Sequence, residues 1–143
     1  MLEIGNTTET ELSIGTIPFN IVSFDTNNDS TFDTNTNSMI INRSGYYEVK
    51  GEFVIAPSVT GDVSVYLYVN GEVEPTVTST FNFSSTGTKK TFTIPSKIIK
   101  TVPTFSNSNV PVKFVVSAAG TLYNANATLI KLHWYNKDDN SML

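Results

Sequence analysis

His133 is the only histidine in the chain, so it is the first residue to consider for acid–base or metal chemistry. A catalytic histidine needs an orienting carboxylate and an exposed nucleophile, and the sequence has no Gly-x-Ser-x-Gly elbow to present a serine. A histidine-based metal site needs more than one histidine. We therefore expect His133 to act in packing or at an interface, and we predict a protein that is not an enzyme and uses no cofactor.

Oxygen-bearing side chains alternate at Asp25, Asn27 and Asp29, which is how a calcium-binding loop begins. An EF-hand loop starting at Asp25 requires glycine at its sixth position and glutamate at its twelfth, where this chain has Ser30 and Thr36. A solvated Asn/Asp turn explains the same residues. The three residues are kept as a calcium candidate beside the expectation that the protein holds no metal.

Aromatic residues near the polar loops offer a second kind of site. Phe81, Phe83, Phe105 and Tyr123 are able to form either a platform on which sugars stack or core plugs beneath the loops. A sugar-cleaving enzyme would also need a pair of convergent carboxylates. The acidic residues fall mainly in expected loops and on solvent-facing strand positions without such a pair, so a carbohydrate-active enzyme is the least favoured function.

Composition limits the class of protein that must position these residues. The 143 residues suffice for one domain, charged residues make up only 15%, and there is no cysteine for a disulfide or a thiolate site. The net charge of −4 and the scattered lysines exclude a nucleic-acid partner. The sequence has no apolar run of about 20 residues and no leader-like N-terminus, so we expect neither membrane insertion nor a secretory signal.

Two strands stand out from the alternation of apolar and polar residues. The first covers residues 45–55, and the second covers residues 63–69 and stops at Asn70-Gly71, a dipeptide that suits the positive φ angles of a tight hairpin turn. We expect these two consecutive strands to pair in one sheet.

The rest of the sequence predicts further short strands. They are expected at residues 16–24, 39–42, 72–80, 88–94, 97–102, 110–118 and 127–135. Pro75 should place its strand at an edge or break it, and Pro95 should end its strand. In the last strand we expect Ile130, Leu132 and Trp134 to face inward. About eight to ten strands without a helix predict an all-β, two-sheet antiparallel sandwich or jelly roll.

The spacing of several motifs resembles the C1q and tumour-necrosis-factor-like jelly roll. The motifs are Phe19, Asp25, Phe32 and Met39, then Gly45-x-Tyr47-x-Val49, the strand and Asn-Gly turn at residues 63–71, and the apolar closing strand at residues 128–135. Pro103 to Asn109 stands where that family has a Gly-Asp turn. The resemblance covers residues 16–135, which we expect to form the domain. Residues 1–15 should be a flexible or anchoring arm, and residues 136–143 a tail.

The resemblance implies a homotrimer in which one sheet of each subunit packs around a threefold axis. The strand positions expected to face outward carry more apolar and aromatic side chains than a monomer usually exposes. This observation, which does not depend on the resemblance, favours a subunit interface over isolated apolar residues on a free surface. The candidate interface residues are Tyr66, Tyr68, Val115, Leu129, His133 and Tyr135.

Thr/Asn-rich, cysteine-free jelly rolls of this kind resemble structural proteins of bacteriophages and prophages. This implies a virion protein assembled in the host cytoplasm: a capsid decoration protein, a head fibre or a receptor-binding tip. Its partners would be a capsid or tail protein, bound through the arm, and host-surface carbohydrate. The alternative is a head domain on a bacterial cell or spore surface with an adhesive or carbohydrate-binding role.

Overall fold

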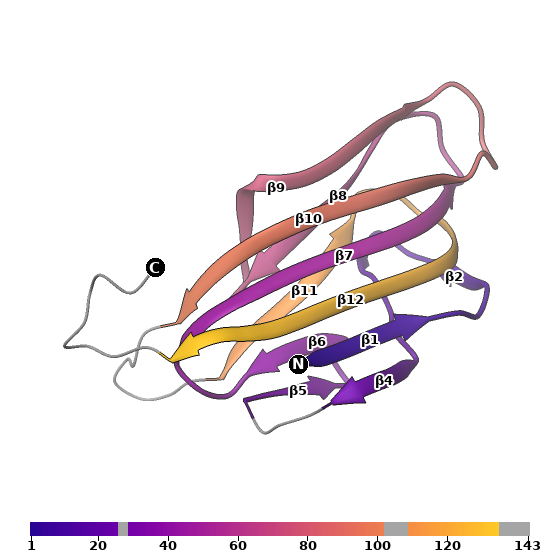
Figure 1. Cartoon of the computed structure of the whole chain (residues 1–143). Helices are drawn as coiled ribbons and strands as arrows, with labels where there is room; N and C mark the ends of the chain where they lie inside the picture. Colours follow the sequence, from indigo (N-terminus) through magenta and orange to yellow (C-terminus); the bar gives the residue numbers. More distant parts are fainter. Residues whose placement is uncertain (26–28, 102–108, 135–143) are drawn as a thin grey trace.

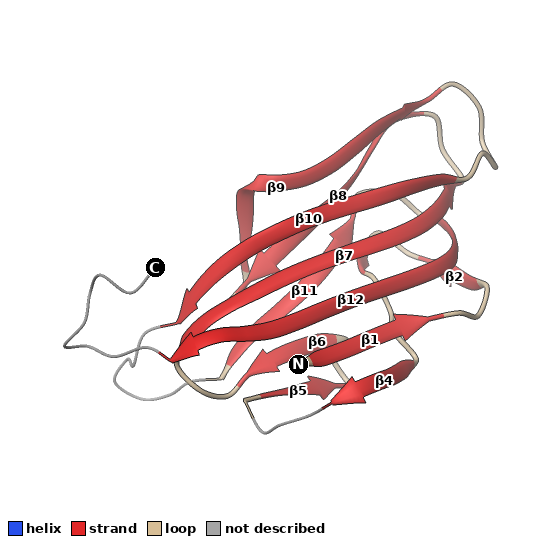
Figure 2. Ribbon diagram, viewed as in Figure 1, coloured by secondary structure: helices blue, strands red, loops and turns tan. Residues whose placement is uncertain are grey.

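The computed structural model describes residues 1–25, 29–101 and 109–134, which form two stacked antiparallel sheets (Figure 1). The strands are β1 (Leu2–Asn6), β2 (Thr10–Leu12), β3 (Gly15–Thr16), β4 (Ile21–Asp25), β5 (Ser30–Asp33), β6 (Ser38–Ile41), β7 (Gly45–Pro57), β8 (Gly61–Val69), β9 (Glu72–Phe83), β10 (Lys90–Thr101), β11 (Val110–Val116) and β12 (Gly120–Trp134). Figure 2 shows no helix in the described part of the chain, and therefore none that is long and apolar enough to cross a membrane.

The sandwich consists of two sheets that we call sheet A and sheet B. Sheet A has the strand order β10-β7-β12-β1-β4, with β2 added beside β12, and sheet B has the order β5-β6-β11-β8-β9, with β3 added beside β11. This is the predicted fold class. The expected pairing of the strands at residues 45–55 and 63–69 is wrong, because β7 and β8 lie in opposite sheets. Their apolar faces meet across the core instead of side by side.

The hairpin between β8 and β9 is confirmed. Asn70 and Gly71 have φ angles of 54° and 82°, and Val69 pairs with Glu72. Pro75 lies in β9, which is an edge strand as expected. Pro95 does not end its strand: β10 continues past it through a register shift between Ile94 and Lys97. Since β10 is also at an edge, the missing N–H of proline costs no interior ladder bond.

The N-terminal segment is part of the sandwich, so the expected free arm at residues 1–15 is wrong. β1 lies between β12 and β4, and the side chains of Leu2 and Ile4 are buried in the core. The short strands β2 and β3 extend sheet A and sheet B. The apolar residues of β1 are too few to show a strand period, but they complete the interior of an existing sheet. The predicted tail at residues 136–143 lies outside the described residues.

The middle of the core is aromatic. Phe53 and Phe114 have ring centroids 4.9 Å apart, and Phe19 lies 6.2 Å from Phe53. Gly51 makes room for this cluster, because a Cβ atom there would lie 2.9 to 3.0 Å from the rings of Phe53 and Phe114. The cluster therefore joins the two sheets through facing strands β7 and β11.

In β12 the buried face is the opposite of the predicted one. Ala125, Ala127 and Leu129 are buried, while Leu132 is 47% exposed. Ile130 is half-buried on the outer face, and the side chain of Trp134 lies outside the described residues. Both alternating sets of this strand contain apolar residues, so the period-two pattern does not decide which set faces inward.

Candidate functional site

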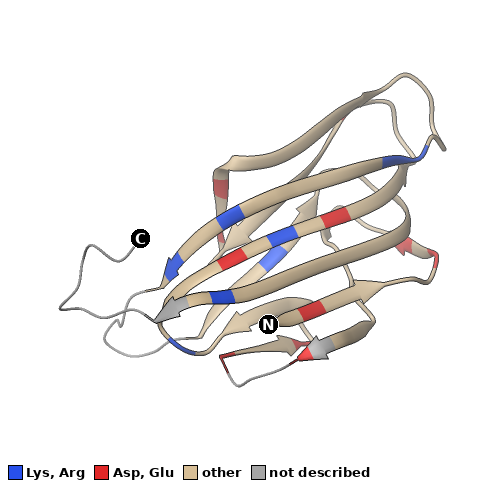
Figure 3. Cartoon of the chain, in the orientation of Figure 1, with Lys and Arg blue, Asp and Glu red and all other residues tan. Residues whose placement is uncertain are grey.

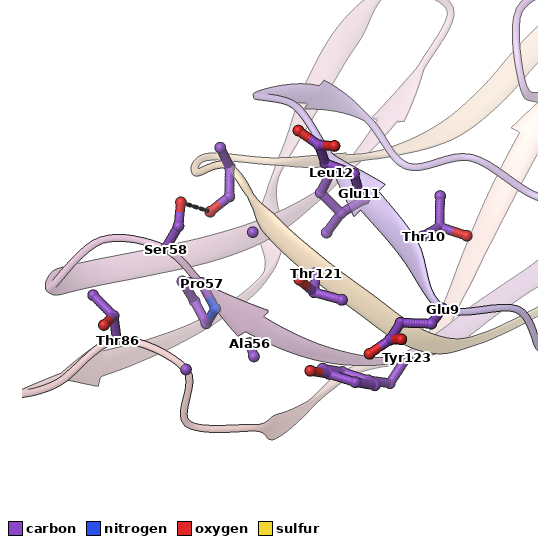
Figure 4. A pocket seen from close by; sticks show the side chains of 13 residues that line it. Glu9, Thr10, Glu11, Leu12, Ala56, Pro57, Ser58, Thr86, Thr121 and Tyr123 are labelled. Carbon is purple, nitrogen blue, oxygen red and sulfur yellow. Dashed lines mark hydrogen bonds between the residues drawn. The ribbon is translucent and has the colours of Figure 1, made fainter.

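A cavity of about 630 Å³ opens at the loop end of the sandwich, where β7 ends and β12 begins (right side of Figure 1; close view in Figure 4). Its walls come from β2 and the preceding residue, the end of β7, the β9–β10 loop and the beginning of β12. The lining residues are Glu9, Thr10, Glu11, Leu12, Ala56, Pro57, Ser58, Thr86, Gly87, Ala119, Gly120, Thr121 and Tyr123. We call this the loop-end pocket.

The pocket has an apolar base and a polar rim. Leu12, Ala56 and Pro57 are buried, whereas the side chains of Glu9 and Thr86 are exposed. Thr121 and Tyr123 are half-buried between base and rim. This combination of a small apolar surface and a few polar groups is typical of binding sites for small ligands.

Close backbone packing fixes the wall formed by β7 and β12. A Cβ atom on Gly120 would lie 2.4 Å from the carbonyl oxygen of Ala56 and 2.7 Å from Cα of Pro57, so only glycine fits there. The Ser58 amide donates to the carbonyl of Ala119 at 2.9 Å, and the Ser58 hydroxyl donates to the same oxygen at 3.1 Å (Figure 4). The wall is thus held by close backbone contacts and by the two hydrogen bonds of Ser58.

A buried asparagine shapes the turn that carries the acidic rim. The Asn6 side chain accepts a hydrogen bond from the Thr8 amide at 3.0 Å and donates to the Thr10 hydroxyl at 3.2 Å. It also donates to the carbonyl of Pro18 at 3.3 Å. Asn6 is 2% exposed, so these bonds are shielded from water and hold the turn that presents Glu9 in place.

Several polar side chains that face the pocket have no hydrogen-bond partner among the described residues. Within the described residues, the side chains of Glu9, Thr86 and Thr121 form no hydrogen bond or salt bridge with another protein group. Tyr123 contacts the ammonium of Lys89, which lies 3.9 Å from the ring centroid. Figure 4 shows the Glu9 carboxylate extending toward Tyr123. The pocket therefore offers hydrogen-bonding groups beside an aromatic ring.

Of the three predicted platform aromatics that the structure describes, one lines this pocket. Phe81 and Phe83 pack against Phe92, with centroid distances of 5.0 and 6.1 Å, and so act as packing residues beneath the loops. Phe105 lies outside the described residues. Tyr123 faces the cavity. Sequence reasoning missed Glu9 and Thr121 because the segment containing Glu9 was read as an arm and β12 was expected to begin later.

A second polar cluster joins the two sheets at the opposite end. Asp29 is paired with Lys131 at 3.4 Å and with Arg43 at 3.7 Å, and the Tyr47 hydroxyl donates to the Arg43 carbonyl at 2.7 Å. Burial raises the pKa of Tyr47, with a further contribution from the Asp29 charge. Burial also lowers the pKa of Lys131, against the opposing attraction of Asp29.

This cluster gives Asp29 a structural role. The positively charged side chains of Arg43 and Lys131 both pair with its carboxylate, and their charge disfavours the binding of a calcium ion there. Asp25 ends the edge strand β4, and Asn27 lies outside the described residues. Among the described residues, no group of three or more His, Cys, Asp or Glu side chains is arranged to hold a metal ion. The structure therefore adds no support to the calcium candidate.

The predicted interface residues do not form one surface. Tyr66, Tyr68 and Val115 are half-buried neighbours on the outer face of sheet B. Leu129 is 0% exposed between Leu2 and Val49, so its assignment to the interface is wrong: it belongs to the subunit core. The side chain of His133 and all of Tyr135 lie outside the described residues.

The outer face of sheet A carries an aliphatic patch instead. Ile98 and Ile130 both pair with Glu48 from opposite sides, and Leu132 follows on β12. Ile98 is 40% exposed and Leu132 47% exposed. We call Ile98, Ile130 and Leu132 the sheet A patch. Acidic and basic residues alternate along β7, which lies between Ile98 on β10 and Ile130 on β12 (Figure 3).

Comparison with solved structures identifies the fold. The chain is similar to the Eiger TNF from S. frugiperda, with a TM-score of 0.70 and 11% identity over 95% of this chain and 94% of that one. It is also similar to rabbit GITRL, with a TM-score of 0.53 and 12% identity over 92% and 94%. No protein-family model and no curated protein matches the sequence. The predicted jelly roll, of the tumour-necrosis-factor-like kind, is thus confirmed.

Proposed function

We propose that this chain is a non-enzymatic, homotrimeric structural and binding protein of a bacteriophage or prophage virion. The observation that carries the trimer is the sheet A patch, in a chain of which 95% aligns with a tumour-necrosis-factor structure. Exposed apolar side chains gathered on one face of a protein are a feature of interaction surfaces.

The occupant we propose for the sheet A patch is the same face of two further copies. Glu48, Lys50 and Glu52 on β7, between the two strands of the patch, give each copy both signs of charge, which suits contact between identical chains. The outer face of sheet B is less suited, because Tyr66, Tyr68 and Val115 are each less exposed than Ile98 and Leu132.

The virion role is supported by the resemblance of this Thr/Asn-rich, cysteine-free jelly roll to phage structural proteins. Because β1 is a sheet strand, we expect the capsid or tail protein to bind a folded surface rather than a free arm. The loop-end pocket also suits the adhesive role of a bacterial cell-surface or spore-coat head domain, which is the second candidate.

Light scattering after size-exclusion chromatography tests the assembly. The wild type should have three times the 15.7 kDa mass of one chain at micromolar concentration. Ile98→Glu should reduce that mass to one chain, while Thr78→Glu, at an exposed position of β9, should leave it unchanged. Circular dichroism should show that both variants are folded, and Leu132→Glu provides a second patch variant. A monomeric wild type would contradict the trimer.

The virion role has a separate test. Particles released after prophage induction or infection of the host that encodes this chain should contain it in purified, DNA-filled fractions, detected by mass spectrometry and by antibody labelling in electron micrographs. Its presence only on bacterial cells or spores would support the second candidate and contradict the virion role.

A further inference from the structure

We infer that the loop-end pocket is a binding site for a neutral saccharide, recognised by Tyr123 together with the unpaired polar groups of the rim. This inference rests on the binding role proposed above, since it names the ligand class, but it does not rest on the trimer. The lining residues named above all belong to one chain.

The charges of the pocket select among ligand classes. Among the described lining residues Glu9 and Glu11 are charged, and their two carboxylates outnumber the single ammonium of Lys89 beside Tyr123, which disfavours sialic acids, sulfated sugars and phosphates. A bare metal ion lacks ligands there, because no suitable group of three acidic side chains exists in the described residues. A wholly apolar ligand would displace water from the rim carboxylates and offer them no hydrogen bond in return. An uncharged molecule rich in hydroxyl groups suits both the rim and the base.

The arrangement of the side chains fits a pyranose ring. The half-buried ring of Tyr123 offers an apolar face to sugar C–H groups, and Glu9 offers acceptors for sugar hydroxyls. Thr121 and Thr86 can each donate and accept a hydrogen bond. The Lys89 ammonium adds donors beside the Tyr123 ring. The side chains of Glu9, Thr86 and Thr121 have no hydrogen-bond partner within the described residues, so they can bind a ligand without first breaking internal hydrogen bonds.

The pocket walls are pre-organised, which lowers the entropic cost of binding. The buried Asn6 side chain holds the turn before β2, and the tight contact of Gly120 with the end of β7 fixes the opposite wall. Lys89 is exposed, so a ligand can displace its ammonium from Tyr123 at small cost. A shallow site of this kind binds weakly by itself, and several copies on one particle would raise the avidity.

Saturation-transfer NMR on the full chain provides the test, with glucose, galactose, mannose and N-acetylglucosamine as separate probes and N-acetylneuraminic acid as the anionic comparison. At least one neutral sugar should receive saturation at millimolar concentration, and the anionic sugar should not. Tyr123→Ala should weaken binding about tenfold, because it removes the stacking surface. Glu9→Gln should weaken it less, since the amide retains one acceptor oxygen.

Tyr68→Ala is the matched control. Tyr68 also lies beneath a lysine, with the Lys113 ammonium 6.0 Å from the ring centroid, but it is on the outer face of sheet B and does not line the loop-end pocket. Binding should be unchanged in this variant. No transfer to any neutral sugar, or equal transfer in Tyr123→Ala and wild type, would overturn the inference. Light scattering on the same samples reports the trimer independently, so the two proposals can fail separately.

Discussion

Truncating two leucines in β12 separates the subunit core from the proposed interface. Leu129 is fully buried between Leu2 and Val49, whereas Leu132 is 47% exposed in the sheet A patch. Leu129→Ala and Leu132→Ala delete the same three carbon atoms from the same strand. Any difference between their losses in free energy of unfolding therefore reflects the surroundings of each side chain and not the atoms removed.

The expected magnitudes follow from burial. At about 0.8 kcal/mol for each buried carbon, Leu129→Ala loses about 2.4 kcal/mol of transfer free energy, and the cavity raises the loss to about 3 to 4 kcal/mol. Leu132→Ala loses about half of the transfer contribution and leaves no closed cavity, so about 1 kcal/mol is expected within the subunit.

Urea denaturation followed by circular dichroism at several protein concentrations measures both effects. The loss in Leu129→Ala should be the same at every concentration, because the side chain contacts only its own subunit. The loss in Leu132→Ala should grow at concentrations where the wild type is assembled, because an interface contribution follows mass action. Equal losses in the two variants, or a concentration-dependent loss in Leu129→Ala, would refute the assignment of Leu129 to the core.

Three further changes test other parts of the structure. Gly120→Ala should lower the free energy of unfolding by about 1 to 3 kcal/mol, because the new Cβ overlaps the backbone at the end of β7; an unchanged melting temperature would contradict that contact. Asp29→Asn should cost about 2 kcal/mol in urea denaturation, because Lys131 is 8% exposed and loses its paired carboxylate; a neutral effect would contradict the pairing. Tyr47→Phe should cost about 1 kcal/mol at neutral pH through the lost hydrogen bond to Arg43. The folded state raises the pKa of Tyr47, so wild-type stability should fall as the pH rises above the unfolded value of about 10, and Tyr47→Phe should lack this component of the slope.

The sequence predicted the all-β sandwich and most of its main strands, because period-two alternation and turn residues are local signals. The alternation in β7 and the Asn70-Gly71 turn each depend on neighbours within a few residues, and both are found in the structure. The pairing of β7 with β10 and β12 has no such local signal. Partners in a sandwich are set by which combination buries every apolar face at once.

The residues of the loop-end pocket were also only partly predictable from local sequence patterns. Tyr123 was a candidate because an aromatic residue near a polar loop is a local pattern. Thr121 lies two residues before Tyr123 on the same strand, but Glu9 is brought to it by β2 pairing with β12, a contact between segments more than a hundred residues apart. No spacing rule relates such distant positions, so the site could be only partly predicted.

The sequence by itself determined an all-β chain without disulfides, a tight hairpin after β8, and the tumour-necrosis-factor-like spacing of its strands. Only the tertiary structure decided that β1 belongs inside sheet A and that Leu129 rather than Leu132 is buried. The physical reason is that alternation divides a strand's side chains into two faces but does not show which face is turned toward the core. Which face is inside depends on the opposite sheet, and that sheet is assembled from the whole length of the chain.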